Sequence, residues 1–348
     1  MSLPPVSAAA PFRLALAGLT HDHVQGFHRS PRRHIDLVGI AEPNAALRAK
    51  FGAEHAIPLE TMFDNLPAML DAANPEAVCA FGSIFEHLAV VEACAPRGIH
   101  VMVEKPLAVS PAHAARMAEL ARQHGIHLIT NYETTWYASN HDVIARAGAG
   151  DIGAVLKVVI HDGHRGPREI GCSEEFLAWL TDPVANGAGA LVDFGCYGAN
   201  LMTRLMQGAR PLSVIAVAQQ FKPAIYPKVD DEATIVLRYE RAVAIIQASW
   251  NWAVSRKDME VYGETGYLVA AEATTVRERH SDDAPETVTQ LAPLAAPNDD
   301  PFEQLAALVR GEITLSRDDL GELENNLLVV DILDAARRSA ASGTAVSL

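Results

Sequence analysis

The chain has 348 residues, enough for two hydrophobic cores, and 49% of them are hydrophobic. Its 43 acidic and 28 basic residues give a formal charge of −15 at pH 7, which disfavours nucleic acid or an anionic membrane as a partner. The longest apolar stretches fall short of the ~18 residues that a membrane span needs, and four cysteines without paired metal-ligand spacing suit a reducing cytoplasm.

The first third of the chain alternates apolar runs with helical patterns, which predicts a parallel sheet with crossover helices. Residues 1–10 lack the features of a secretory signal and are expected to form a disordered extension. The expected strands are 12–18, 35–41, 77–81, 99–103 and 126–130, and helical patterns begin at 44 and cover 84–95 and 110–124. Ser110 is a plausible N-cap, with Pro111 at the first helical position. These units predict a Rossmann-like domain over residues 11–131.

The pattern of apolar runs over residues 132–348, the second part of the chain, predicts an α+β domain. Apolar or alternating runs occur at 154–161, 213–220, 232–239, 242–249 and 258–263. Because no comparable helix separates the last four runs, they are expected to be neighbouring antiparallel strands. Helical spacing over 195–207 and 320–337 predicts helices on one face of that sheet. The predicted fold class is therefore an α/β Rossmann domain with a parallel sheet, followed by an α+β domain with an open antiparallel sheet.

Lys105 follows one of the expected strands, within Glu104-Lys105-Pro106, at a place that a ligand could reach. An ammonium group beside a Rossmann cleft can hydrogen-bond a reacting hydroxyl and hold an oxyanion, as hydride transfer requires. The alternative is that Glu104 and Lys105 form an ordinary solvated pair and that Pro106 merely ends the strand.

With these features the sequence resembles the Gfo/Idh/MocA oxidoreductases, named for glucose–fructose oxidoreductase, inositol dehydrogenase and a rhizopine-catabolism protein. The resemblance covers about residues 11 to 342 and depends on Glu104-Lys105-Pro106, on Gly187–Tyr197 and on a helix at 320–341. It implies a C-terminal domain whose open antiparallel sheet often mediates oligomerisation. A homo-oligomer, dimer or tetramer, is therefore expected, with the helix 320–341 packing back on the Rossmann domain.

The loop after the first strand departs from the usual dinucleotide-binding pattern G-x-G-x-x-G, since it reads G-L-T-H-D-H. Gly18 is retained, Thr20 stands at the second glycine and His23 at the third. We expect Gly18, Thr20, His21 and His23 to contact the cofactor, with free N–H groups and a helix dipole available to the pyrophosphate. Asp22 is compatible with a pyrophosphate only if it points away or caps the helix.

The residue at the end of the second expected strand indicates whether the cofactor is NAD or NADP. Glu42 lies near the offset of ~20 residues from the glycine loop at which an acid binds ribose hydroxyls. Its carboxylate would repel a 2′-phosphate, which favours NAD over NADP; the alternative is a surface acid at a strand end. By resemblance, the same cleft is also lined by Phe81, Ser83, His87 and Glu104.

The resemblance assigns the chemistry to Lys105, Asp193 and Tyr197. Oxidation of an alcohol needs a base or relay at its hydroxyl while hydride moves to the nicotinamide. The free pKa of a tyrosine is about 10, so Tyr197 needs a nearby cation such as Lys105 to act near neutrality. Asp193 would share a helix face with Tyr197, bind a substrate hydroxyl and orient Lys105. The alternatives are a helix N-cap for Asp193 and a core aromatic for Tyr197.

Histidine-containing clusters at 21–28 and 161–164 lack the spacing of a strong metal motif, and no metal is expected. The second cluster leaves a strand and enters a glycine-rich turn, where specificity residues often lie. The candidate substrate-contacting residues are His161, His164, Trp179, Asn251 and Trp252. Each of the last three could equally be packing in the core or on the sheet.

The predicted function is NAD-dependent oxidation of a hydroxyl on a small sugar, cyclitol or related polyol in the cytoplasm. One alternative is a non-catalytic nucleotide-binding sensor like the yeast galactose-regulon repressor; the altered glycine loop favours it, whereas Lys105 and Tyr197 argue against it. Another is an NAD-dependent glycosidase, which oxidises its substrate transiently and returns the hydride. Net consumption of NAD distinguishes a dehydrogenase from such a glycosidase.

Overall fold

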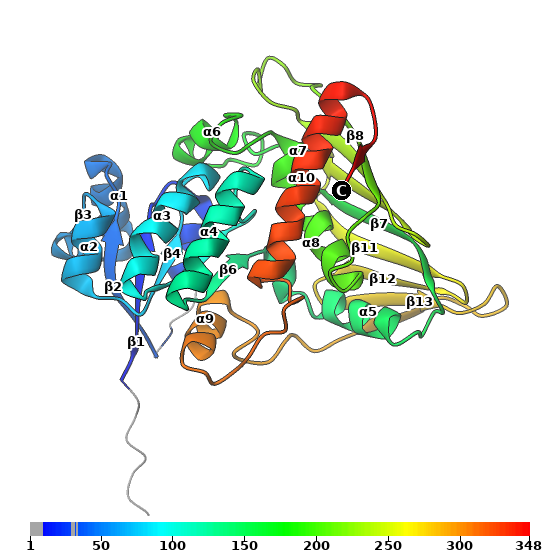
Figure 1. The fold of residues 1–348 in the computed structure, drawn as a ribbon, viewed down its shortest axis with the longest axis horizontal. Coiled ribbons are helices and arrows are strands. Elements are labelled where there is room, and N and C mark those ends of the chain that lie inside the picture. The colour runs from blue at the N-terminus through cyan, green and yellow to red at the C-terminus, as the bar shows by residue number, and fades with distance from the viewer. Residues whose placement is uncertain (1–9, 29–31, 33) are drawn as a thin grey trace, which may run out of the picture.

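A computed structural model describes residues 10–28, 32 and 34–348. The expected extension at 1–10 therefore lies outside the described residues, apart from Ala10. The chain folds around two β-sheets, with helices packed on each of them (Figure 1). No helix within the described ranges combines the length and apolarity needed to cross a membrane.

The first sheet is parallel throughout, as predicted. Its strands, in spatial order, are β3 (Met62–Phe63), β2 (Ile35–Ala41), β1 (Phe12–Ala17), β4 (Ala77–Ala80), β5 (His100–Glu104) and β6 (Leu128–Asn131). This is the order of a doubly wound nucleotide-binding sheet, in which ligands bind at the carboxyl ends of the strands where the chain direction around the sheet reverses. That switch point lies between β1 and β4.

Helices cover both faces of the first sheet. One face carries α2 (Leu66–Ala73), α3 (His87–Cys94) and α4 (Pro111–His124), and the other carries the 3-10 helix η1 (Asp22–His28) and α1 (Ala45–His55). The short 3-10 helices η2 (Leu59–Thr61), η3 (Ile84–Glu86), η4 (Ala95–Arg97) and η5 (Glu133–Trp136) lie in the connections. The Ser110 hydroxyl caps α4 as predicted, by accepting the His113 N–H.

A later helix, α9 (Pro301–Val309), also packs on the first sheet, although its residues belong to the segment expected to form the second domain. Its Phe302 and Leu305 share a core with Phe12 of β1. Arg32 reaches the α9 N-cap Asp300, with Nε 2.9 Å from Oδ1. The 3-10 helix η1 is short, and α9 adds to the cover of this face of the sheet.

The second sheet is mixed. Its strands, in spatial order, are β14 (Thr287–Gln290), β13 (Thr275–Arg279), β12 (Tyr267–Glu272), β11 (Arg256–Gly263), β7 (Val155–Gly163), β10 (Val243–Ser249), β9 (Glu232–Arg238), β8 (Ser213–Gln219) and β15 (Val346–Ser347). All neighbours are antiparallel except β7 and β10, which run parallel. The prediction that 242–249 and 258–263 are neighbours is wrong, because β7 lies between them. Their connection crosses the end of β7, where the Trp252 N–H donates to the His164 carbonyl.

One face of the second sheet is covered by helices. These are α5 (Ala138–Gly148), α7 (Ala190–Asp193), α8 (Gly195–Leu205) and α10 (Leu323–Ser342). The short helix α6 (Glu174–Leu180) instead packs over His21, in the loop after β1. In Figure 1, α10 runs between α4 and the second sheet. Its Leu323 and Val330 pack in the core of the first sheet, whereas Val329 and Ile332 pack in that of the second. The helix therefore joins the two sheets into one packed body.

Candidate active site

A cleft of about 760 Å³ opens where the carboxyl ends of the first sheet meet the helix-covered face of the second. Its lining residues include His21, His23, Lys105, His164, Asp193 and Tyr197. They come from the loop after β1, the end of β5, the end of β7, α7 and α8. Residues that lie far apart in the sequence thus meet at the position where a doubly wound sheet binds its ligand.

Lys105 and Asp193 form a buried ion pair in this cleft. The Lys105 ammonium donates to the Asp193 carboxylate and, at 2.9 Å, to the Asp193 carbonyl oxygen. The second carboxylate oxygen accepts the Trp250 indole N–H at 2.9 Å. Burial alone would lower the pKa of Lys105, but the Asp193 charge raises this pKa above its usual value. Burial alone would raise the pKa of Asp193, but the Lys105 charge holds that pKa below its usual value. Both groups are therefore charged at neutral pH.

Tyr197 lies between two lysines. The Nζ atoms of Lys105 and Lys257 are 5.0 and 4.8 Å from the centroid of its ring. Even so, burial, followed by the charges of Glu133 and Asp162, raises the pKa of Tyr197 well above its usual value. The expectation that Lys105 would lower this pKa is wrong, since Asp193 already neutralises Lys105. The phenol is a neutral hydrogen-bond donor and acceptor at physiological pH.

Sequence reasoning missed Lys257, Glu133 and Asp162. Lys257 pairs with Glu133, whose other oxygen accepts the Tyr137 hydroxyl at 2.6 Å. Asp162 lies opposite Lys257 in the β7–β11 register and is 1% exposed. Its Oδ1 has no hydrogen-bond partner among the described residues, and burial raises its pKa well above the usual value. The pairing of β7 with β11 brings Asp162 beside Lys257, and Glu133 reaches Lys257 from η5; no local motif signals either contact.

His23 and Glu104 form a second polar pair. His23 Nδ1 is 3.0 Å from Glu104 Oε2, and the Asn131 amide donates to Oε1 at 2.8 Å. Burial would raise the pKa of Glu104, but the charges of His23 and His21 and these hydrogen bonds lower it to about 2. Glu104 is therefore ionised, so Nδ1 of His23 must carry the donated proton. In neutral His23 the lone pair is then on Nε2.

His21 lies beside this pair and is buried under Phe176 and Trp179, with ring centroids 4.7 and 5.4 Å away. Burial, followed by the charge of His23, lowers its pKa well below the usual value. Its Nδ1 accepts the His23 backbone N–H at 3.1 Å, so the ring proton of neutral His21 lies on Nε2. Nε2 is the atom that faces Glu104, 3.9 Å from Oε2, and a nitrogen that carries a proton cannot ligate a metal. The contacts therefore do not favour a metal ion held by His21, His23 and Glu104.

Of the five candidate substrate residues, His164 lines the cleft. Its Nδ1 accepts the Gly166 N–H at 2.9 Å, which leaves an Nε2–H donor on the neutral ring. His161 instead pairs with Asp258 at 3.0 Å, and Trp252 packs against it at 6.1 Å between centroids. Bidentate contact from Arg256 to Asp258 makes a metal at His161, Asp258 and Glu260 unfavourable.

Two further candidates have structural partners. The Asn251 amide donates to Asp231 and Glu232 at the start of β9. Trp179 lies behind His21, and its indole N–H approaches the Thr20 carbonyl at 3.4 Å. Neither residue is among those lining the cleft.

The altered glycine loop uses several of its own N–H groups. Leu19 N–H donates to Glu42 and His21 N–H to the Phe81 carbonyl, both at 2.9 Å, and His23 N–H donates to His21. Within this part of the described chain, the N–H groups of Thr20 and Asp22 remain for a phosphate. The expected helix start is a 3-10 helix, so the helix dipole available here is smaller than a long α-helix supplies.

Asp22 points away from the loop toward the second half of the chain. Its carboxylate accepts the Ser173 N–H at 2.9 Å and the Ser173 hydroxyl. Ser173 is the N-cap of α6, whose Phe176 and Trp179 cover His21. Asp22 thus ties α6 to the first βα loop, and its charge is satisfied there.

A second pocket, of about 230 Å³, lies over the switch point and is lined by Gly18, Thr20, Glu42, Gly82, Glu86 and His87, among others. Gly18 has φ +84°, and a Cβ there would lie 2.7 Å from the Gly82 nitrogen, so a side chain is excluded. His87 Nδ1 bonds the Leu107 carbonyl at 3.1 Å, and burial lowers its pKa to about 4. Its Nε2 is buried without a partner in the described chain.

These groups fit the adenosine half of a dinucleotide. Ribose hydroxyls can donate to the orphaned His87 Nε2 and to lone pairs of the Glu42 carboxylate that its two backbone contacts leave free. The other expected contacts are indirect: the Ser83 hydroxyl donates to Glu86 at 2.8 Å, and the Phe81 ring is buried in the core. Residues 81–83 can therefore contribute mainly backbone to this pocket.

Comparison with known proteins agrees with both halves of the fold. Residues 12–132 match the profile described as "Oxidoreductase family, NAD-binding Rossmann fold", and residues 142–269 match the GFO/IDH/MocA C-terminal domain. An inositol dehydrogenase homologue from Azotobacter vinelandii, solved with NAD+, superposes with a TM-score of 0.82 at 19% identity over 98% of each chain. An aldose-aldose oxidoreductase from Caulobacter crescentus gives 0.80 at 21% identity over 97% of this chain and 100% of that one.

Two curated dehydrogenases are similar in sequence. Trans-1,2-dihydrobenzene-1,2-diol dehydrogenase of Xenopus tropicalis is 24% identical over 72% of this chain and 71% of its own length. D-glucoside 3-dehydrogenase of Escherichia coli K12 is 26% identical over 54% of this chain and 52% of its own length. With both domain profiles matched in order, the chain belongs to the Gfo/Idh/MocA family of NAD-binding oxidoreductases.

Proposed function

We propose that the protein is an NAD-dependent dehydrogenase that oxidises a hydroxyl on a sugar, cyclitol or related polyol. The observation that carries this proposal is the buried Lys105–Asp193 pair beside Tyr197, in a cleft at the carboxyl ends of a doubly wound sheet. The dehydrogenases of diols and glucosides among its relatives support the same chemistry.

The roles follow from the state of each group. Bound NAD would accept the hydride from the substrate carbon. Lys105, charged and oriented by Asp193, keeps part of its donor capacity for the reacting oxygen and stabilises negative charge that develops there. Tyr197, a neutral phenol that lines the cleft, can take the hydroxyl proton as it gives its own phenolic proton to water in the cleft. Asp193 positions Lys105, and its carboxylate can accept a hydrogen bond from a second substrate hydroxyl.

NAD is proposed over NADP on the basis of charge. The pocket over the switch point contains the carboxylates of Glu42 and Glu86 and, among the residues the structure describes, no lysine or arginine. A 2′-phosphate would be repelled there. Glu42→Ala should weaken NAD binding and narrow the preference over NADP; an unchanged preference in a calorimetric titration of both cofactors would remove Glu42 from the site.

The protein is further proposed to act in the cytoplasm as a homo-oligomer. Its four cysteines are unpaired in the structure, which suits a reducing compartment. The uncovered face of the second sheet carries exposed apolar side chains, Ile215 and Val217 of β8 among them. Such a face supports self-association.

The deciding experiment measures NADH absorbance when the purified protein and NAD meet a panel of sugars, inositols and sugar acids. Steady net NADH formation on one class of compound supports a dehydrogenase. A redox-neutral glycosidase would release product from a glycoside without net NADH, and a sensor would bind NAD without turning over any compound. Either result would overturn the proposed activity.

A further inference from the structure

Acidic residues outnumber basic ones in the lining of the cleft. Among the lining residues, three are fixed cations, namely Lys105, Arg256 and Lys257, and five are acids, namely Asp22, Glu133, Asp193, Asp258 and Glu272. Counting these fixed charges alone, the lining carries two more negative than positive charges. A cleft concentrates its own field, so this excess acts directly on a ligand inside it.

Each of the three cations is already paired with a carboxylate of the same cleft. Lys105 pairs with Asp193 and Lys257 with Glu133. Arg256 makes bidentate contact with Asp258, with Nε–Oδ1 and Nη2–Oδ2 both at 2.8 Å. These two side chains alternate with Lys257 along β11, so they point to the other face of the sheet, where Asp258 also pairs with His161, and their charges cancel in the count. Because Lys105, Asp193 and Asp258 are also largely buried, these pairs are weakly screened by solvent. Within the described lining, no cation is left over to neutralise an anionic substrate.

We propose that this site, acting as the dehydrogenase described above, selects uncharged polyhydroxy substrates and rejects carboxylated or phosphorylated ones. Bringing an anion into the cleft would desolvate it against an excess of negative charge, with no unpaired cation to compensate. Hydroxyl groups, in contrast, can donate to Asp193, Glu133 and Glu272 and accept from Lys105 and the His164 Nε2–H. The excess charge also suits the oxidised nicotinamide ring, which is positively charged.

The Lys257–Glu133 pair is the element that sets this selectivity. Lys257 lies 4.8 Å from the centroid of Tyr197, so an ammonium group freed from Glu133 would stand beside the proposed reaction centre. Replacing Glu133 with glutamine removes the neutralising charge and makes Lys257 available to a carboxylate. Glu264→Gln is the matched control, because Glu264 pairs with Arg241 outside this cleft and loses the same charge.

The test uses the whole protein with NAD and two matched series: glucose, glucuronate and glucosamine, and galactose, galacturonate and galactosamine. We expect kcat/KM for the neutral sugar to exceed that for its acid by at least about tenfold. In Glu133→Gln, but not in Glu264→Gln, this ratio should fall at least about threefold. An acid used as well as its neutral parent, or a ratio unmoved by Glu133→Gln, would overturn the proposal.

A thermal-shift measurement with each sugar in saturating NAD separates this proposal from the proposed activity. If no compound yields NADH but the neutral sugars raise Tm more than the acids, the binding preference holds and the dehydrogenase assignment fails. If an acid gives the larger shift, the selectivity proposal fails whatever the activity.

Discussion

The buried pair of Lys105 and Asp193 is not an arrangement that stability alone would favour. Two buried charges lose their hydration, and a pair of apolar residues of similar volume often stabilises a core equally well. Here the pair has a second carboxylate contact from Trp250 and sits at the wall of a cleft rather than deep in a core. Removing one member would leave the other buried and uncompensated.

The first prediction concerns Lys105→Met. We expect it to abolish NADH formation while NAD still binds, because the second pocket is untouched. It should also lower the free energy of unfolding by about 3–5 kcal/mol, since Asp193 remains as an unpaired buried charge. A turnover assay tests the loss of NADH formation, and calorimetric titration tests whether NAD still binds. Denaturant unfolding measures the change in the free energy of unfolding.

The double variant Lys105→Met/Asp193→Asn separates stability from catalysis. Without the unpaired carboxylate, it should regain most of the lost stability and remain inactive. A double variant that recovered activity would remove Lys105 from the reaction, and a Lys105→Met protein with full rate would do the same.

The second prediction concerns the pH dependence due to Asp162. Its pKa in the folded protein is raised by burial, whereas an unfolded aspartate titrates near about 3.9. Above the unfolded pKa the folded state therefore binds more protons at this site, and the contribution of Asp162 to stability falls as pH rises. Asp162→Asn should raise Tm at pH 7, and this gain should vanish below about pH 4. A gain that was the same at both pH values would show that titration is not its cause.

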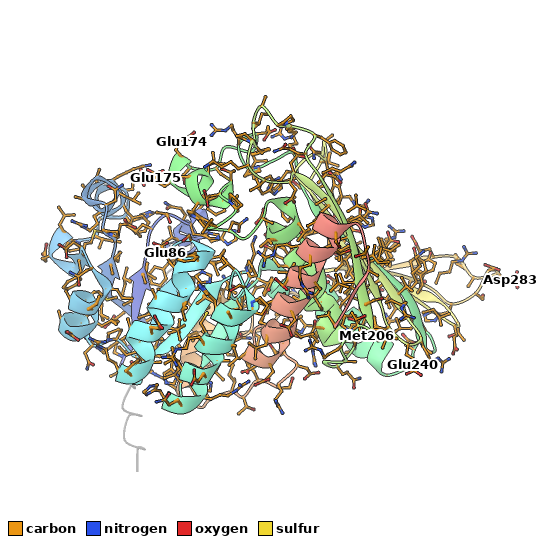
Figure 2. The ribbon with its side chains drawn as sticks, turned by 45° about the horizontal axis from the view of Figure 1, so that its top comes forward. Glu86, Glu174, Glu175, Met206, Glu240 and Asp283 are labelled. Atoms are coloured by element: carbon orange, nitrogen blue, oxygen red, sulfur yellow. The ribbon has the colours of Figure 1, made fainter. Side chains whose placement is uncertain are left out.

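At the scale of elements, the Asp22 side chain ties the start of α6 to the first βα loop. The Asp22 carboxylate accepts both the N–H and the hydroxyl of Ser173 at the start of α6, where Glu174 and Glu175 are labelled in Figure 2. The rings of Phe176 and Trp179 then cover His21. The position of α6 therefore affects both the cofactor loop and the cleft.

The third prediction is that Asp22→Ala loosens α6. Loss of two hydrogen bonds to a charged acceptor should cost about 2–3 kcal/mol and speed amide hydrogen exchange over residues 173–180. Glu174→Ala is the control, because its side chain is 78% exposed and its ion pair with Arg168 is worth at most about 1 kcal/mol. Equal exchange in the two variants would contradict the anchoring role of Asp22.

Elements with strong local patterns could be predicted from the sequence, and those defined by distant contacts could not. Apolar runs and turn residues identified β1, β2, β4 and β10 to within a residue or two, because a strand with one or both faces buried needs apolar residues at regular positions. The position of β7 between β10 and β11, in contrast, is set by pairing between segments whose partner residues lie 86 to 108 positions apart in the sequence. The same holds for the site. Lys105, Asp193 and Tyr197 lie in recognisable sequence motifs and could be predicted, whereas Lys257 lies beside Tyr197 only because of the strand register and could not.

At the scale of the whole molecule, the second sheet is covered on one face and open on the other. Val159, Ile245, Val236 and Ile215 lie side by side in register across β7, β10, β9 and β8, with side chains opposite the helix-covered face. Ile215 is 47% exposed, and nearby Val217 is 58% exposed. A contiguous apolar row on a broad, flat sheet is typical of a protein interface.

The last prediction follows from that row. If copies associate through it, light scattering coupled to gel filtration should give a multiple of the 37.4 kDa chain mass. Val217→Asp should then shift the protein to a monomer, because a carboxylate buried in an apolar interface loses hydration without gaining a partner. The folded monomer should lose little stability, since exposed substitutions usually change it by less than about 0.5 kcal/mol. Leu59→Asp, at a site 57% exposed on the first half of the chain, should leave the mass unchanged. A monomeric wild-type protein, or a Val217→Asp variant that kept its oligomeric mass, would place the interface elsewhere or remove it.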